Sequence, residues 1–291
     1  MIRWFLIVIS FSISAGCTSD KLDYPHDAHP AVTYLERSTA AKMDRKLPVP
    51  AHVPVSALQN AYPRIGIISH HLMIEPVITA WWENLKLLRN DIDTFIIISP
   101  RHFARREVSY SFSPLRWQTD KGYIPVNQKM YAQFQRIFRA KPDPDAFHLE
   151  HGVGAVVPYI SRYYPESTIM PILFDWRHPD GSAAKKTADC IADILRKNQR
   201  VFVLFSIDFS HHAGRELTDT RDALSKESLL NPHTKPPLQV HCDNTTGILV
   251  LFDLIRRFEL QGTHLFCATD GGKYLGKDFD DITSYFFMFY Y

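Results

Sequence analysis

Short apolar runs alternate along this chain with longer segments in which apolar residues recur at helical spacing. The apolar runs, rich in Val, Ile and Phe and bounded by turn residues, predict strands, and the periodic segments predict helices. We expect strands at 64–69, 94–99, 107–112, 168–174, 201–207, 265–269 and 284–290, and helices at 76–90, 126–139, 151–163, 181–197, 216–228 and 245–260. This alternation predicts a single α/β domain in which helices cover a central sheet.

Three of the predicted strands end at side chains that can bind a metal. The strand at 64–69 runs into His70 and His71, the strand at 94–99 into His102, and the strand at 201–207 into Asp208 and His211. In sheets of this class, ligands bind outside the carboxyl ends of the strands. If the three strands are parallel, these side chains meet in one crevice.

The first and third of these segments each leave a choice open. Side chains alternate along a strand, so one of His70 and His71 faces the crevice and the other is an ordinary turn residue. Asp208 and His211 share one face if their segment turns helically, and a carboxylate–imidazole pair suits acid–base catalysis or support of a metal ligand. The alternative is that Asp208 caps a turn.

Two further residues lie at predicted helix starts. Glu150 and His151 open one helix, where the acidic residue alone would interact favourably with the helix dipole. Cys242 precedes another, and a thiol beside a helix N-terminus has a lowered pKa and becomes a better metal ligand or nucleophile. The alternative for Cys242 is a buried, inert thiol.

Composition sets the class of protein, and the N-terminal residues suggest its location. The 291 residues carry a net charge of +2, which gives no reason to expect a nucleic-acid partner. Residues 1–17 resemble a lipoprotein signal that ends at Cys17, which would be lipidated and anchor the protein in the cell envelope, the outer membrane being favoured if the host has two membranes. The alternatives are a cleaved signal that releases a soluble exported protein and an uncleaved anchor. Residues 18–57 are polar and are predicted to form a tether, in which His29 is assigned no role, and 58–291 form the body.

Once Cys17 is set aside, three cysteines remain, Cys190, Cys242 and Cys267. Because this number is odd, at least one thiol stays unpaired.

Six segments together resemble one known family. IGIISHH, FIIISPRH, LEHGVGAVVPYI, VFVLFSIDFSHH, HCDNTTGILVL and SYFFMFYY are similar, in order and spacing across roughly residues 60–291, to the Memo-like family, which includes the bacterial AmmeMemoRadiSam system protein B. The resemblance implies the fold of class III extradiol dioxygenases, a mixed sheet with helices on both faces and a mononuclear metal site at one end.

The resemblance also implies roles for individual residues. The metal ligands would be His71, His102 and Cys242, with Asp208 and His211 beside the metal, His211 as a general base, and His151 lining the same pocket. The chain departs from the family pattern at Leu72-Met73, where the family has Ala-Gly, at Gly154, where it has a second Glu, and at Asp243, where it has the Gly of its Cys-Gly segment. These departures alter the pocket wall and leave the ligands in place.

Three functions are compatible with these residues. Two imidazoles and one anionic ligand leave coordination positions open, as in non-haem iron oxygenases, so the first is a redox or dioxygenase-type enzyme that uses iron(II), or copper or zinc, on a small organic substrate. The second is a binding scaffold with a vestigial metal cleft. The third is a zinc-dependent hydrolase.

Overall fold

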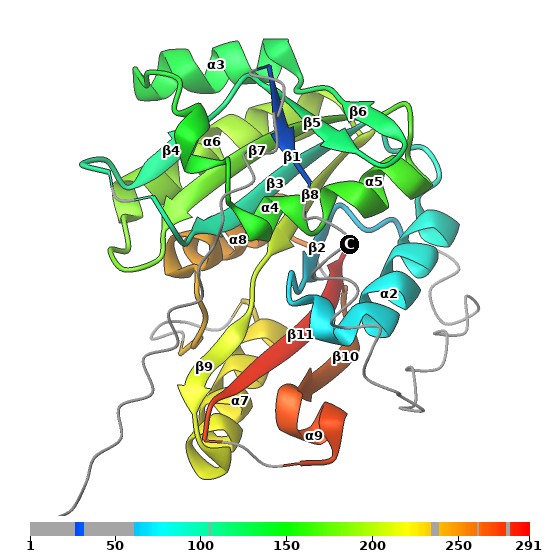
Figure 1. The fold of residues 1–291 in the computed structure, drawn as a ribbon, viewed down its shortest axis with the longest axis vertical. Helices are drawn as coiled ribbons and strands as arrows, with labels where there is room; N and C mark the ends of the chain where they lie inside the picture. The colour runs from blue at the N-terminus through cyan, green and yellow to red at the C-terminus, as the bar shows by residue number, and fades with distance from the viewer. Residues whose placement is uncertain (1–26, 32–60, 105, 234–238, 261, 278–279) are drawn as a thin grey trace, which may run out of the picture.

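The computed structural model describes residues 27–31, 61–104, 106–233, 239–260, 262–277 and 280–291. Its main sheet has eight strands, in the order β10-β11-β2-β8-β3-β7-β4, with β9 paired to β11 (Figure 1). The strands are β2 (Ile65–Ile68), β3 (Thr94–Arg101), β4 (Tyr110–Phe112), β7 (Thr168–Asp175), β8 (Val201–Ser206), β9 (Phe209–Ala213), β10 (Thr263–Asp270) and β11 (Ile282–Tyr290). β2, β8, β3 and β7 are parallel to one another, whereas β4, β9, β10 and β11 pair antiparallel. The sheet is therefore mixed.

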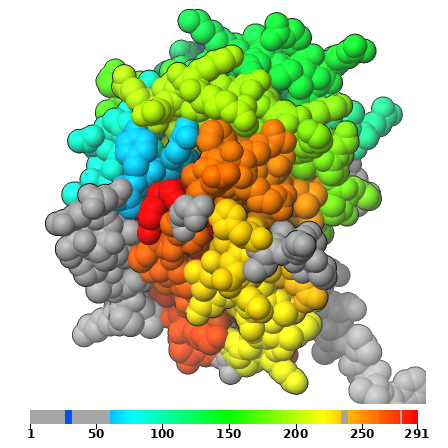
Figure 2. Space-filling view, turned by 180° about the vertical axis from the view of Figure 1, so that it is seen from behind, coloured from blue at the N-terminus to red at the C-terminus, as the bar shows by residue number. Residues whose placement is uncertain are grey.

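Helices cover both faces of this sheet. α2 (Glu75–Leu88), α4 (His151–Gly154) and α5 (Val157–Tyr163) lie in front of it in Figure 1. α6 (Gly181–Lys197) and α8 (Thr245–Phe258) pack on each other on the opposite face, which Figure 2 shows from behind. α3 (Gln128–Phe138) packs on α6, α7 (Arg215–Leu230) on β9 and β11, and α9 (Gly271–Leu275) on β10 and β11. The predicted fold class, a mixed α/β domain with helices on both faces, is confirmed.

The predicted elements agree with the structure except at one interrupted helix and at short strands that the sequence pattern does not reveal. The helix predicted at 151–163 is two helices, α4 and α5, and Pro158 lies in the first turn of the second, where its missing N–H costs nothing. The segment after Asp208 is the strand β9 and not a helical turn, because it pairs with β11. Asp208 and His211 are thus not placed together by helical spacing.

A second, three-stranded sheet contains a strand from the predicted tether. β1 (Ala28–Pro30) pairs parallel with β5 (Arg116–Thr119), which pairs antiparallel with β6 (Gly122–Ile124). His29, to which the sequence assigned no role, is buried in this sheet, with its Nε2 2.6 Å from Ser113 Oγ. The signal segment at 1–17 and most of the tether lie outside the described residues. None of the described helices combines the length and the apolar character that a membrane crossing demands.

Burial of His29 predicts loss of stability in acid. Burial, together with the nearby His148, lowers its pKa from 6.5 to about 4. Between these values the unfolded chain binds a proton that the folded protein does not, so the free energy of unfolding falls as the pH drops from about 6.5 to about 4, by up to about 3 kcal/mol. Urea unfolding at several pH values should show that the free energy of unfolding falls less with decreasing pH in His29→Gln than in the wild type. Equal pH dependence in both proteins would contradict the prediction.

Candidate metal centre

The carboxyl ends of three parallel strands bring the predicted site together. His70 follows β2, His102 follows β3 and Asp208 follows β8, and these strands are neighbours in the order β2-β8-β3. Asp243, just before α8, reaches the same place because its N–H donates to the carbonyl oxygen of Asp208 (3.0 Å). The ends of the parallel strands therefore bring these side chains together, as the strand pattern predicts.

His70 is held so that one ring nitrogen faces two carboxylates. The Ser206 hydroxyl donates to the carbonyl oxygen of Gly152 (2.5 Å), so its oxygen is left to accept a hydrogen bond from Nδ1 of His70 (3.1 Å). The Nε2 lone pair then lies 3.5 Å from Oδ2 of Asp208 and 3.4 Å from Oδ2 of Asp243. Burial lowers the pKa of His70 to about 4, which keeps the imidazole neutral.

This arrangement favours a cation between His70 and the two aspartates. His70 Nε2 is buried and has no hydrogen-bond partner among the described residues. Its lone pair faces Oδ2 of Asp243, an anionic oxygen that repels it, and Oδ2 of Asp208, and a positive ion between them would be attracted to all three groups. The residues present therefore fit a metal ion.

His102 is fixed by a buried carboxylate. Glu150 accepts hydrogen bonds from the backbone N–H (2.8 Å) and from Nδ1 (2.7 Å) of His102, and also from the N–H of Gly152 (3.0 Å). The other ring nitrogen, Nε2, lies 3.7 Å from Oδ2 of Asp243. Burial alone would lower the pKa of His102, but Asp243 and Glu150 outweigh it and raise the pKa to about 10. A carboxylate on Nδ1 is the usual support of a metal-binding histidine.

The two aspartates differ in charge preference although both are buried. Burial favours the protonated form of each. In Asp243 this effect is overcome by His102 and His211, which hold the pKa well below its usual range, whereas burial and the neighbouring Asp243 raise the pKa of Asp208. Ser69 donates to Asp208 through its hydroxyl (2.5 Å). Of the two aspartates, Asp243 is thus the one whose surroundings favour the anionic form.

Two groups of side chains place their ligand atoms within 4.8 Å of one another, which makes each group a candidate for holding an ion. Among the described residues these groups are His70, His102 and His151, and His70, Asp208 and Asp243. His70 belongs to both, and Asp243 lies within 3.7 Å of His70 and His102. The structure therefore contains His/Asp groups that could hold a metal.

Of the three ligands carried over from the resemblance, the structure brings only His102 into these groups. His71 is exposed, and its Nδ1 lies 2.6 Å from the hydroxyl of Tyr285. Cys242 is half-buried, and burial raises the pKa of its thiol, contrary to the lowering expected at a helix start. As ligands His71 and Cys242 stay predictions, and the geometry favours the adjacent residues, His70 and Asp243. Because neighbouring side chains in extended backbone point to opposite sides, a shift of one residue exchanges which of them faces the cluster.

The predicted catalytic residues border the cluster. His151 stacks on His102 with ring centroids 4.2 Å apart, and it is half-buried, with its pKa lowered by burial to about 4. His211 places Nε2 3.7 Å from Oδ2 of Asp243 and Nδ1 3.4 Å from Oγ1 of Thr283. Asp208, His211 and His151 thus lie together beside the candidate ligands, and their catalytic roles stay predictions.

The sequence reading missed Glu150 and Ser206, which hold the ligands in place. Glu150 directly precedes His151, and its position at a helix start suggested only an interaction with the helix dipole. Nothing in the local sequence indicates that it reaches His102, 48 residues away. Glu150 reaches His102 because α4 lies very close to β3. The closeness is seen at Gly152, where an added Cβ would lie only 2.0 Å from Oγ of Ser99.

Replacing Glu150 with glutamine is expected to weaken metal binding about 10- to 100-fold, the range for a residue hydrogen-bonded to a ligand. The amide keeps the shape but removes the charge that orients His102. Metal affinity measured by calorimetry for Glu150→Gln and for Glu75→Gln, a carboxylate of α2 outside the cluster, tests this. Equal affinity in the Glu150 variant and the wild type would contradict the role of Glu150.

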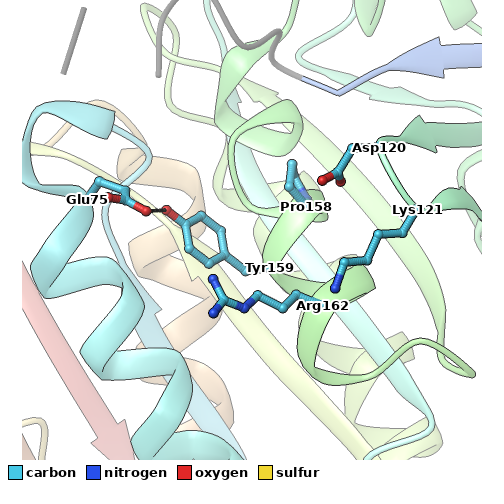
Figure 3. A pocket seen from close by; sticks show the side chains of 6 residues that line it. All are labelled: Glu75, Asp120, Lys121, Pro158, Tyr159 and Arg162. Atoms are coloured by element: carbon cyan, nitrogen blue, oxygen red, sulfur yellow. Dashed lines mark hydrogen bonds between the residues drawn. The ribbon is translucent and has the colours of Figure 1, made fainter. Parts of the chain in front are cut away.

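The structure also has a cavity of about 270 Å³ with a different lining. It lies between α2, the β5–β6 turn and α5, and Figure 3 shows its side chains, with the Tyr159 hydroxyl donating to Glu75 (3.5 Å). Its lining residues are Glu75, Asp120, Lys121, Pro158, Tyr159 and Arg162, and none of them belongs to the metal-centre groups. Because acidic and basic groups are mixed, the cavity favours no charge class of ligand.

Comparison with known proteins agrees with the resemblance seen in the sequence. The family model described as Memo-like protein matches residues 33–240. The chain is 25% identical over 176 residues to a MEMO1 family protein of Pyrobaculum aerophilum, covering 60% of each chain. It is 24% identical over 209 residues to one of Pyrobaculum arsenaticum (71% of this chain, 72% of the relative) and 22% identical over 200 residues to one of Thermotoga neapolitana (67% and 70%).

The matched range includes most of the site. It contains His70, His102, Asp208 and His211 and ends before Asp243. The chain spans 60% of the length of the Pyrobaculum aerophilum relative and 49% of that of the Caldivirga maquilingensis relative. With the family model covering well over half of its residues, the chain belongs to the Memo-like family.

Proposed function

We propose that this protein binds one divalent metal ion between His70, His102 and Asp243 and that the metal serves catalysis. The observation that carries the proposal is the buried Nε2 of His70, which has no hydrogen-bond partner among the described residues and faces two carboxylates. Ligands about 2.1 Å from one ion lie about 3.0 to 3.4 Å from each other. The 3.4 and 3.7 Å separations from Asp243 to His70 and His102 are close to that requirement.

The donor set favours iron(II). Two imidazoles and one carboxylate form the ligand set of non-haem iron oxygenases, which leaves coordination positions open. A thiolate at Cys242 would have favoured softer metals such as copper, and Asp243 as the anionic ligand removes that preference. Zinc fits the same set. When bound, the ion would polarise a substrate or a small molecule at its open positions.

The remaining side chains would handle protons and substrate. His211 lies at the edge of the cluster, half-buried, with Nε2 directed at Asp243, and is the proposed acid–base group. Asp208, whose pKa is raised by burial and by Asp243, can hold a proton beside the ion. His151, half-buried and stacked on His102, would border the substrate beside that ligand. The substrate would be a small organic molecule that reaches the half-buried histidines.

Elemental analysis after anaerobic purification tests this proposal. We expect about one equivalent of iron per chain, and oxygen uptake with a substrate panel only in the iron-loaded protein. A second candidate is a zinc-dependent hydrolase, favoured by Asp208 and His211 as two ionisable groups beside the ligands that could exchange a proton with a metal-bound water. Hydrolysis of esters or phosphoesters by the zinc form, without oxygen uptake by the iron form, would select it. If the protein binds neither iron nor zinc, both enzyme proposals are ruled out and the hypothesis of a binding scaffold remains.

We also propose, from the sequence, that the chain is exported and anchored by lipid at Cys17. The apolar stretch at 4–13 followed by Ser14-Ala15-Gly16 supports cleavage before this cysteine. In a bacterial expression host, wild-type protein should incorporate labelled palmitate and sediment with membranes, whereas Cys17→Ala should lose the label. Labelling that persists in Cys17→Ala would contradict the anchor.

A further inference from the structure

β1 lies before the residues matched by the family model, yet it packs beside the loop that carries Glu150. The model match begins at residue 33, whereas β1 covers Ala28–Pro30. β1 adds to the edge of β5 through main-chain pairing of His29 with Trp117 and their neighbours. Outside the pairing, an exposed ion pair joins Asp27 to Arg116 (2.5 Å). β1 is therefore an addition to the part of the fold that the family model covers.

The side chain of His29 anchors this strand. It is 2% exposed and its Nε2 is hydrogen-bonded to Ser113 (2.6 Å). The ring stacks on Phe147, with centroids 5.5 Å apart and planes inclined by 28°, and it contacts Trp117 at 5.1 Å. Phe147 is itself fully buried, so the strand fixes one side of a buried aromatic residue.

Phe147 leads directly to the metal centre. Its N–H donates to the carbonyl oxygen of Pro144 (2.9 Å), and its own carbonyl oxygen accepts from the N–H of Glu150 (3.2 Å). Glu150 in turn holds both the backbone and the ring of His102. A continuous series of contacts thus runs from His29 through Phe147 and Glu150 to a candidate ligand.

We infer that β1 is a positioning element of the metal centre, acting through the ring of His29 on Phe147 and thereby on Glu150. Only the metal-binding part of this inference rests on the proposed function. Loss of the His29 ring leaves Phe147 without one of its packing partners. The turn that presents Glu150 then opens more often, and the hydrogen bonds of Glu150 to the N–H groups of His102 and Gly152 break with it.

The test measures those two N–H groups and metal affinity in the same full-length variants. In His29→Ala, amide hydrogen exchange at His102 and Gly152, followed by NMR, should accelerate about tenfold or more. Affinity for iron(II) or cobalt(II) should fall about 3- to 10-fold, less than for a residue bonded directly to a ligand. His29→Phe, which keeps a ring on Phe147 but not the hydrogen bond to Ser113, should restore both values.

The matched control is Phe134→Leu, which alters a buried ring of α3 that packs against Phe112 and Phe138. At an equal loss of Tm it should leave exchange at His102 and Gly152 unchanged. Unchanged exchange in His29→Ala, or the same acceleration in Phe134→Leu, would overturn the inference. A wild-type protein that binds no ion would overturn the proposed function instead, and amide exchange would still decide whether β1 positions Glu150.

Discussion

Asp243→Asn is expected to lower the metal affinity by at least about 100-fold, which is more than the loss found for residues that only support a ligand. The reason is that Asp243 is the anion shared by the cluster, with His70, His102 and His211 each within 3.7 Å of its Oδ2. An amide of the same shape removes the charge that offsets the ion. Calorimetric titration with cobalt(II) or iron(II) under anaerobic conditions measures the change.

Cys242→Ser is the matched control, since it removes the ligand implied by family resemblance one residue away. It should keep wild-type affinity, and the cobalt(II) form of the wild type should lack a thiolate-to-metal charge-transfer band. Loss of metal in Cys242→Ser with retention in Asp243→Asn would reverse the assignment of the anionic ligand.

The second large effect is expected at His70. His70→Ala should reduce metal affinity by about 100-fold or more, because it removes the imidazole common to both groups of ligand atoms. His71→Ala removes a hydrogen bond to Tyr285 on the other side of the chain. It should leave affinity within about threefold of the wild type and reduce the free energy of unfolding by about 1 kcal/mol.

The two substitutions are at adjacent residues. A general disturbance of the loop after β2 would therefore lower the metal affinity of both variants alike. Chemical unfolding of each variant, alongside the metal titration, separates folding from binding. Equal loss of metal affinity in both would contradict a specific role for His70, and a loss confined to His71→Ala would restore the ligand set implied by the resemblance.

The sequence predicted the fold and the place of the site because both depend on local patterns. Buried parallel strands such as β3 and β8 are nearly uninterrupted apolar runs, and the residues that follow them must meet at one edge of the sheet. The choice between His70 and His71 is of another kind. It depends on how the chain turns after Ile68, and that turn follows from contacts such as the hydrogen bond from His70 to Ser206, 136 residues away.

Long-range contacts account for what the sequence did not predict. β9 has a length and polarity typical of a turn, and it is a strand because β11 lies beside it. Glu150 reads as a helix-start residue until His102 is seen against it. His29 lies in a polar stretch, and only the rings of Trp117 and Phe147 reveal why it is buried.

The most direct test of the metal centre is a crystal structure of the protein loaded anaerobically with iron(II), with anomalous diffraction measured at the iron edge. We predict one anomalous peak between Nε2 of His70, Nε2 of His102 and the carboxylate of Asp243. A peak bound by the sulfur of Cys242 and the imidazole of His71, or no peak within reach of His70, would contradict the account.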